Sequence, residues 1–557
     1  MFVVRVLLFL FLSASWIVSE AVAVNLQDWS FLWVAVCSLM IAVAIPSRAE
    51  LVGRVSSRRP NGGSNYARRV WITAAALLAV LTVLGVGSSR LLRTEAFRDL
   101  LGQESQGEST GALPVLDIRQ APLVDENMAR RAAEKRLSDI PALGSQAYVG
   151  KLEKQVVRGR MYWIGFLEHR DFWKWRQANT TPGYVMVSAH DPSDVELVTE
   201  VGGKKLALKY IESAYFHEQA DRAIRFSGHV GAIMLDLIPE VDDDGRPFLV
   251  APVARKSILM SGSQVAGVLV LDVQDGATRY YDIGSVPAWI DRAQPQGLVT
   301  QQLQDKLYLV NGWLNPSDSG RLRVSGKLDV VYGTNGRAYY FGGITSMAKD
   351  GGIVAFSLID SRTKESVRYP IAGITEEVAK HVAQGVIPEK GYRATNPLPF
   401  VSDGHPAYVM ALTEATGVTR AYAMVSIIDQ QKVAVAETLV ATARLFQEHS
   451  ATDRSKFAGG GAQTLLKAHG RVERIASEVR SGNTSYKFML DSTKGRFFSA
   501  GEDISEELAI THAGDEVEVS YQESSGSAMG VLTFKNATIG LAGAVDGALV
   551  EKVAARH

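Results

Sequence analysis

The pattern of hydrophobic and polar positions divides the chain into an apolar amino-terminal part and a long remainder of mixed polarity. The most apolar stretch is Val70–Ser88, which contains no charged residue. At about 1.5 Å of rise per residue, a helix over this stretch crosses a hydrocarbon core of about 30 Å. Two apolar runs, Val6–Val18 and Trp29–Ile45, precede it. The pattern predicts two or three transmembrane helices, because residues 1–24 fit either a first helix or a cleaved signal peptide.

Six arginines in the polar segment before Val70 predict the orientation of the chain. Short loops rich in Lys and Arg stay on the cytoplasmic side of a membrane. The third apolar run then leads outward, which predicts an inner (cytoplasmic) membrane protein whose large carboxyl-terminal region is extracytoplasmic. Recruitment of anionic lipid or of a cytoplasmic partner is a second role for the same arginines. These topology-determining residues are Arg48, Arg54, Arg58, Arg59, Arg68 and Arg69.

A turn followed by an aromatic strand occurs four times in the remainder of the chain, within residues 156–163, 242–248, 333–340 and 402–408. Asn-Gly and Asp-Gly pairs favour hairpins, because both central turn positions need positive φ. After each turn comes an apolar strand that ends in aspartate, and then a second strand. The aspartates are Asp191, Asp272, Asp360 and Asp429. Helices are expected between the units, at Leu206–Ile224, Ala288–Leu307, Thr375–Ala383 and Thr438–His449.

The repeated unit resembles the PepSY module of bacterial envelope proteins, in which a helix precedes a G-x-x-aromatic strand and a V-x-V-D-x-x-(T/G) strand. Residues 126–198 match best, and the three later units match more loosely. The overall layout resembles uncharacterised bacterial and phage membrane proteins with such tandem modules. The resemblance implies a small α+β fold used for binding or inhibition rather than catalysis, and it supplies no catalytic residues.

The carboxyl-terminal residues 466–540 read as five short strands with one helical turn, a layout similar to a small OB-type barrel. The fold class expected for the whole chain is therefore α+β: transmembrane helices, tandem helix-on-antiparallel-sheet modules and a terminal β-barrel. The expected parts are 1–24 (first helix or signal peptide), 25–89 (two transmembrane helices with the arginine-rich loop), 90–120 (linker), 121–200, 201–285, 286–372 and 373–449 (PepSY-like modules), 450–465 (linker), 466–540 (barrel) and 541–557 (tail).

Composition and motifs add few chemical constraints. The 59 Lys and Arg residues balance the 59 Asp and Glu residues, so no overall basic charge favours nucleic acid. The single cysteine excludes an intramolecular disulfide. The sequence contains no H-E-x-x-H, C-x-x-C or P-loop motif. We therefore expect no catalytic residue, no cofactor and no metal, and we interpret the strand-end aspartates as turn caps.

One aromatic segment is unusual enough to single out as a candidate contact site. Tryptophans alternate with basic residues there, in a position that reads as a loop, and exposed Trp and Arg are enriched at interaction hot spots and at membrane interfaces. Packing in the core is the alternative interpretation. The residues that would contact a partner or a membrane are Phe172, Trp173, Lys174, Trp175 and Arg176.

The sequence favours a non-enzymatic, membrane-anchored scaffold or component of an envelope-associated assembly. The expected partners are membrane lipid and other envelope proteins, including further copies of this chain, because exposed strand edges favour pairing. A PepSY-type protease inhibitor or regulator is the first alternative, and a nucleic-acid-binding membrane protein with an OB fold is the second. Nucleic acid is not an expected partner, because the predicted barrel carries many acidic residues and faces outward.

Overall fold

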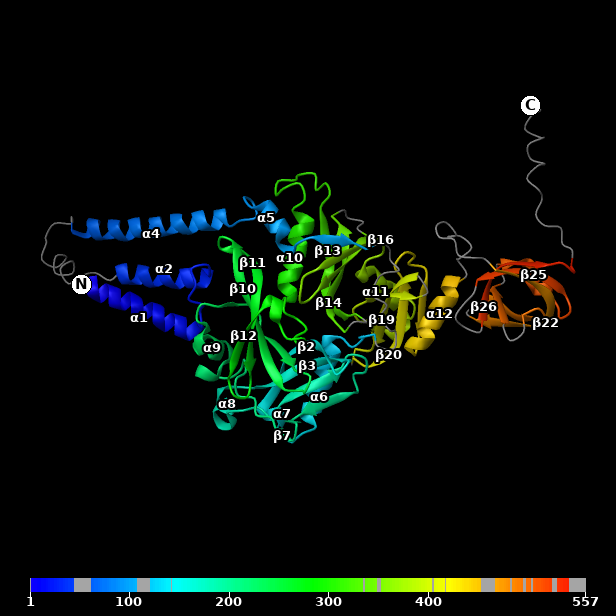
Figure 1. Ribbon diagram of the computed structural model, residues 1–557, viewed down its shortest axis with the longest axis horizontal. Helices are drawn as coiled ribbons and strands as arrows, with labels where there is room; N and C mark the ends of the chain where they lie inside the picture. The colour runs from blue at the N-terminus through cyan, green and yellow to red at the C-terminus, as the bar shows by residue number, and fades with distance from the viewer. Residues whose placement is uncertain are drawn as a thin grey trace, which may run out of the picture. The chain divides into compact units, whose positions relative to one another are not determined.

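The structure is a computed structural model of the full chain (Figure 1). It divides into two compact units, Met1–Ala443 and Arg444–His557, which are described separately. The residues that the structure describes are 2–44, 62–107, 121–141, 143–333, 336–347, 352–402, 405–415, 417–451, 466–480, 483–493, 497–501, 504–522 and 528–539.

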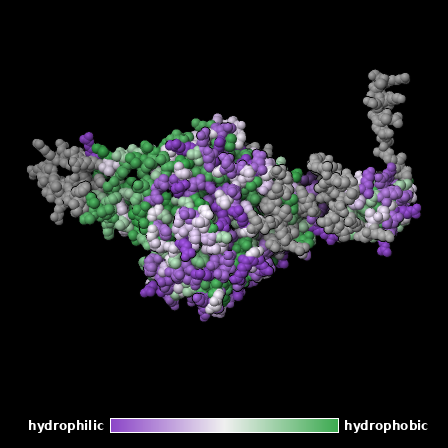
Figure 2. Space-filling view, in the orientation of Figure 1, coloured by the Kyte–Doolittle hydropathy of each residue, from purple (hydrophilic) through white to green (hydrophobic). Residues whose placement is uncertain are grey.

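Three apolar helices open the first unit: α1 (Phe2–Glu20), α2 (Trp29–Ala44) and α4 (Gly62–Gly87). Among the described residues, one helix is long and apolar enough to cross a membrane, over Val70–Gly87, whereas the apolar parts of α1 and α2 are shorter. The expected cluster of two or three transmembrane helices is therefore wrong. In this structure α1 packs on α2 and α2 on α4 (Figure 1), and hydrophobic residues gather over all three (Figure 2).

Four antiparallel sheets form most of the first unit, and their strands follow one another mainly in chain order. The first sheet contains β2 (Ala147–Val157), β3 (Arg160–His169), β4 (Tyr184–Ser188) and β5 (Val195–Val198). The second contains β8 (Ile233–Met234), β9 (Ile238–Val241), β10 (Pro247–Ile258), β11 (Ser261–Asp272) and β12 (Thr278–Asp282).

The third sheet adds one parallel strand from the segment after α4. It contains β1 (Glu104–Gln106), β13 (Leu322–Tyr332), β14 (Ala338–Ser346), β15 (Ile353–Asp360) and β16 (Ser366–Gly373). The fourth contains β17 (Arg393–Ala394), β18 (Leu398–Ser402), β19 (His405–Thr413), β20 (Thr419–Ser426) and β21 (Val433–Ala436). A separate small hairpin pairs β6 (Glu200–Val201) with β7 (Lys204–Lys205).

The four predicted hairpins are confirmed by strand pairing. Val157 pairs with Arg160, Val241 with Pro247, Tyr332 with Ala338 and Ser402 with His405, so each predicted turn joins two neighbouring antiparallel strands. At the first turn, Arg158 and Gly159 both have positive φ, at 51° and 77°. This is the backbone that a two-residue turn between twisted strands requires.

The helices of the globular part are few and short compared with the sheets. They are α5 (Thr94–Arg98), η1 (Asp99–Leu101), α6 (Glu126–Ser138), α7 (Leu143–Gln146), α8 (Phe172–Ala178), η4 (Phe216–Glu218), α9 (Ala220–Ile224), η5 (Arg225–His229), η6 (Ile283–Ser285), α10 (Gln296–Tyr308), α11 (Glu376–Gly385), η7 (Pro388–Lys390) and α12 (Leu439–Ala451), the last of which crosses the boundary between the units.

The expected α+β class is therefore wrong, because the described chain is mostly β-sheet in several sheets. The expected helix over Leu206–Ile224 forms only in its second half, as η4 and α9, and the residues before Phe216 are not helical. Leu208 exchanges backbone hydrogen bonds of 2.9 and 2.8 Å with Thr181, and the buried side chains of Leu206 and Leu208 alternate along the backbone, as in a strand. Pairing with a distant segment overrides the local helical pattern here.

Neighbouring sheets also share hydrophobic cores, so they do not form separate modules that each have a core of their own. One cluster of buried residues combines α6, the first sheet, α10 and the third sheet, and it includes Met128, Val185, Leu303 and Tyr340. A second cluster joins the first sheet to the second through residues such as Ile164 and Leu269. The apolar face of a sheet is thus covered by neighbouring sheets as well as by a helix.

The second unit contains a closed five-stranded barrel. Its interior is aromatic and aliphatic, with Phe488 stacked on Phe498 at 5.5 Å between ring centroids and Phe534 edge-on to Phe488. The elements are β22 (Leu466–Arg480), β23 (Asn483–Leu490), β24 (Phe497–Gly501), η9 (Glu506–Ile510), β25 (Glu516–Gln522) and β26 (Ala528–Asn536). The strands pair around the barrel in the order β22-β23-β24-β26-β25.

Candidate membrane-docking site

The turn between α1 and α2 is hydrogen-bonded to the second sheet and to the segment just before it. The backbone N–H of Val24 donates to the carbonyl of Val230 at 2.8 Å, and the Asn25 side-chain amide donates to the Gly231 carbonyl at 3.0 Å. The Gln27 side-chain amide donates a hydrogen bond of 3.3 Å to the carbonyl of Leu259, which lies at the tip of the β10–β11 hairpin. The ends of α1 and α2 are therefore fixed to the globular part by polar contacts.

The carboxyl-terminal end of α4 meets the same hairpin tip. The buried hydroxyl of Ser88 accepts a hydrogen bond from the Met260 N–H at 3.1 Å. Two residues further on, Arg90 forms a two-point ion pair with Asp305 of α10, at 2.6 and 3.0 Å. A guanidinium bound at two points has a fixed direction, so the apolar helix is held firmly at the point where it enters the globular part.

Arg222 of α9 connects the end of α1 to a group of aromatic side chains. Its guanidinium donates to the Ser19 carbonyl in the last turn of α1, at 2.5 Å, and to the Phe216 carbonyl at 3.5 Å. The Phe216 backbone has a φ of +56°, which is uncommon for a residue other than glycine. This turn leaves the Phe216 side chain 61% exposed.

The predicted contact segment forms helix α8 and not a loop. Asp171 caps the helix by accepting a hydrogen bond from the Lys174 N–H at 2.9 Å. Trp175 is buried, and its indole N–H donates to the Glu218 carboxylate at 3.1 Å. Trp173 is 75% exposed, so the structure assigns the two tryptophans different environments. Phe172 and Lys174 are half-buried, whereas Arg176 is exposed.

The half-buried ring of Phe172 links α8 to the segment before α9. It packs edge-on against Trp173 at 5.3 Å and against Tyr215 at 5.0 Å between ring centroids. Phe216 completes this group at 6.4 Å from Phe172. Sequence reasoning missed Tyr215 and Phe216, although two adjacent aromatic residues within a polar stretch were a signal that could have identified them. We refer to Phe172, Trp173, Tyr215 and Phe216 as the aromatic foot.

The structure describes two of the six predicted topology-determining arginines. Arg68 is exposed on α4, and Arg69 lies in the same helix. Arg48, Arg54, Arg58 and Arg59 lie outside the described residues.

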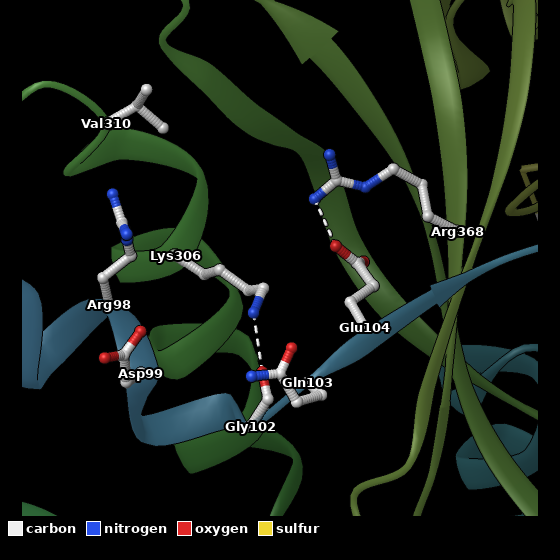
Figure 3. A pocket seen from close by; sticks show the side chains of 8 residues that line it. All are labelled: Arg98, Asp99, Gly102, Gln103, Glu104, Lys306, Val310 and Arg368. Atoms are coloured by element: carbon white, nitrogen blue, oxygen red, sulfur yellow. Dashed lines mark hydrogen bonds and ion pairs between the residues drawn. The ribbon is translucent and has the colours of Figure 1, made fainter.

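A cavity of about 560 Å³ lies where the chain leaves α5 and reaches α10 and β16 (Figure 3). Its lining includes the cations Arg98, Lys306 and Arg368 and the acids Asp99 and Glu104. Figure 3 shows Lys306 turned to the Gly102 carbonyl, at 2.6 Å, and Arg368 turned to the Glu104 carboxylate, at 2.5 Å. Lys306 therefore holds the segment after α4 against α10, and Arg368 holds it against the third sheet.

A network of buried ionisable side chains joins three of the sheets. Glu240 of β9 accepts backbone hydrogen bonds from Asp291 and Arg292 at 3.1 and 3.3 Å. Arg292 pairs with Glu153 of β2 at 2.5 Å, and the Tyr332 hydroxyl of β13 donates to Asp291 at 2.6 Å. Burial raises the pKa of Glu240 to about 8, against the opposing charge of Arg292. The network fixes the first, second and third sheets relative to one another.

A second buried carboxyl lies at the end of β3. Glu168 accepts hydrogen bonds from both the hydroxyl and the backbone N–H of Ser213, the latter at 2.8 Å. Burial raises the pKa of Glu168 to about 7, and the two hydrogen bonds oppose that rise. Within the described residues, no group of three or more His, Cys, Asp or Glu residues is arranged to hold a metal ion.

Comparison with known proteins does not assign the chain to a family. No family model matches it, and no curated protein matches it. The β-fructofuranosidase BmSUC1 of Bombyx mori, described as GH32, is 11% identical over 73% of this chain and 70% of that chain, with a TM-score of 0.17. The α-L-arabinanase of Cellvibrio cellulosa is 11% identical over 69% of this chain and 95% of that chain, with a TM-score of 0.14.

A third solved structure, cobalt-substituted ACO of Synechocystis, is 8% identical over 50% of this chain and 47% of that chain, with a TM-score of 0.14. The first two are described as a fructofuranosidase and an arabinanase, and the expectation that this chain is not an enzyme is not carried further. TM-scores this low define neither a shared fold nor a reaction. None of the three is described as a PepSY or OB-fold protein, so that resemblance remains a prediction.

Proposed function

We propose that this chain is a membrane-anchored protein of the cell envelope whose globular part serves as a platform for other envelope proteins. The observation that carries the proposal is the environment of α4. None of its apolar span is buried by the rest of the protein, and its side chains such as Trp71, Leu78 and Val83 are exposed. A hydrophobic surface of this length is stable in lipid and unstable in water.

The second support is the rigid connection between α4 and the sheets. Ser88 binds Met260, and Arg90 binds Asp305, within three residues of the end of the helix. Over these described residues, no flexible linker therefore separates α4 from the globular part. The platform role rests on the strands at the sheet edges. Among the described residues, β5, β12 and β21 each pair with one neighbour, which leaves an edge that another chain can extend.

Reporter fusions test the orientation. A periplasmic reporter joined after residue 110 should be active, and one joined after residue 55 should be inactive, because the arginine-rich loop favours the cytoplasmic side. The reverse pattern would contradict the proposal and would support a cytoplasmic role such as nucleic-acid binding.

Co-purification from detergent after cross-linking in intact cells tests the platform role. A stoichiometric assembly of several envelope proteins is the expected result. A single protease as the sole cross-linked partner would instead support the inhibitor alternative. A matched control is the same chain with Val80→Arg in α4, which places a charge in the span and should reduce recovery from the membrane fraction.

A further inference from the structure

We propose that the aromatic foot rests in the phospholipid headgroup region of the membrane and forms a second, peripheral contact beside the α4 anchor. This inference rests on the proposed function, because α4 defines where the bilayer lies. The occupant of the aromatic surface is then the lipid surface itself and not another protein.

The position of the foot follows from the contacts that surround it. The ends of all three apolar helices meet the globular part within one region, through Arg222 and Ser19, through Val24 and Val230, and through Ser88 and Met260. Arg222 contacts both the last turn of α1 and the backbone of Phe216. If α4 spans the bilayer up to Gly87, the segment around Ser19 and the foot beside it lie at the bilayer surface.

The side chains of the foot have the chemistry that this region favours. Trp173 and Phe216 present large exposed apolar surfaces, and Tyr215 combines an aromatic body with a polar hydroxyl. Trp and Tyr are enriched where one end of a side chain meets hydrocarbon and the other meets water. Further exposed apolar side chains occur in the same docking segments: Val24, Leu26, Phe226, Val230 and Leu259.

The charges around the foot are compatible with a lipid headgroup. Lys174 and Arg176 alternate with the tryptophans, and Arg222 lies beside Phe216. Three acids of these segments have polar partners, and one of them, Asp221, accepts from the Gln219 side-chain amide at 3.1 Å. Asp171 caps α8, and Glu218 accepts from Trp175 and pairs with Lys209 at 3.1 Å. Cations next to exposed aromatic rings favour a surface that carries phosphate groups.

Site-specific fluorescence in lipid nanodiscs tests the proposal with the full chain. Cys37→Ser removes the single cysteine, and Trp173→Cys or Leu314→Cys then places one environment-sensitive label at each position in turn. Leu314 is a matched control, because it is 78% exposed and lies in the loop between α10 and β13. The nanodiscs contain phosphatidylethanolamine and phosphatidylglycerol, with or without a phospholipid that carries a nitroxide near its headgroup.

The label at 173 should shift its emission to shorter wavelength and lose at least about half of its intensity to the shallow nitroxide, whereas the label at 314 should change little. A third variant, Val80→Cys in α4, reports the anchor through a nitroxide deep in the acyl chains. If 80 is quenched and 173 is not, the foot proposal fails and the anchor stands. If 80 is not quenched, the anchor itself fails. A blue shift at 173 without nitroxide quenching means that protein covers the foot, which also overturns the proposal.

Discussion

An aspartate at the end of a strand can accept hydrogen bonds from backbone N–H groups that the following turn leaves unpaired. The structure shows this contact at all four repeated positions. Asp191 accepts from the Ser193 N–H at 2.8 Å, Asp272 from Gln274 at 2.9 Å, Asp360 from Arg362 at 2.8 Å and Asp429 from Gln431 at 3.0 Å. The interpretation of these residues as turn caps is confirmed, because the contact is local and depends on the type and spacing of residues in the sequence.

Burial makes the Asp360 cap more important than the Asp429 cap. Asp360 is buried, accepts two backbone hydrogen bonds and pairs with Arg337 at 2.8 Å. We expect Asp360→Ala to lower the free energy of unfolding by about 2–3 kcal/mol, because the Arg362 and Thr363 N–H groups lose a charged acceptor and Arg337 loses its buried partner. Asp429→Ala, the matched control at a half-buried position, should cost about 1 kcal/mol or less. Denaturant unfolding in detergent compares the two, and equal effects would contradict the burial explanation.

The raised pKa of Glu168 predicts a dependence of stability on pH. Its carboxyl ionises near pH 4.5 when exposed and near pH 7 in the folded protein, because it is buried. Stability from this group is therefore complete below about pH 4.5 and falls as the pH rises toward about 7, by up to about 3 kcal/mol. Glu168→Gln cannot ionise and can still accept from Ser213.

Thermal unfolding of the full chain between pH 4.5 and pH 7.5 measures this effect. The Gln variant should lose less stability over this range than the natural chain, and a parallel pH profile for the two proteins would contradict the assignment. No sequence signal singles out Glu168, since Ser213 meets it only through the fold.

At the scale of elements, the accuracy of the sequence analysis depends on how local the stabilising contacts are. Ile353–Asp360 was predicted as a strand, and β15 has these bounds, because β-branched and apolar residues favour strands and a turn follows. The first half of the helix expected over Leu206–Ile224 did not form, because Leu208 pairs with Thr181, which lies outside any local window, whereas the second half contains η4 and α9. In the candidate site, the aromatic segment was found by composition, but its division into a buried Trp175 and an exposed Trp173 depends on Glu218, which is distant in sequence.

The pairing of β4 with β5 depends on one glycine. Gly183 has a φ of +151°, and a Cβ atom there would lie 1.9 Å from the Val198 carbonyl oxygen. Gly183→Ala must separate the two strands, so we expect a loss of about 3 kcal/mol or more in the free energy of unfolding. Gly203→Ala is the control, since its φ is +76° but no described heavy atom lies within 4 Å of its Cβ position. That variant should cost only about 1–2 kcal/mol. Circular dichroism during denaturant titration separates the two outcomes.

At the scale of the whole molecule, counting apolar residues overestimated the membrane part. The runs Val6–Val18 and Trp29–Ile45 have the composition of membrane spans. However, α1 ends at Glu20 and α2 begins at Trp29, and the apolar part of each helix is shorter than a span. The intervening turn is bound to the globular part through Val24 and Asn25. The sharing of cores between sheets was equally hidden, because a hydrophobic face in the sequence does not specify which element covers it.

The second unit provides the last prediction, which concerns independent folding. The buried core of the described barrel residues lies between Ala468 and Phe534, and each of the five described strands pairs with a neighbour on both sides. Residues 444–557 expressed alone should therefore fold and unfold in one cooperative transition. Stability should be modest, because a small domain buries a limited fraction of its surface.

Phe498→Ala removes a fully buried ring that contacts Phe488 and Tyr521, and it should lower the free energy of unfolding by about 3–5 kcal/mol. Loss of the transition in the variant alone is the expected result, whereas a fragment without any transition would show that the barrel needs the rest of the chain.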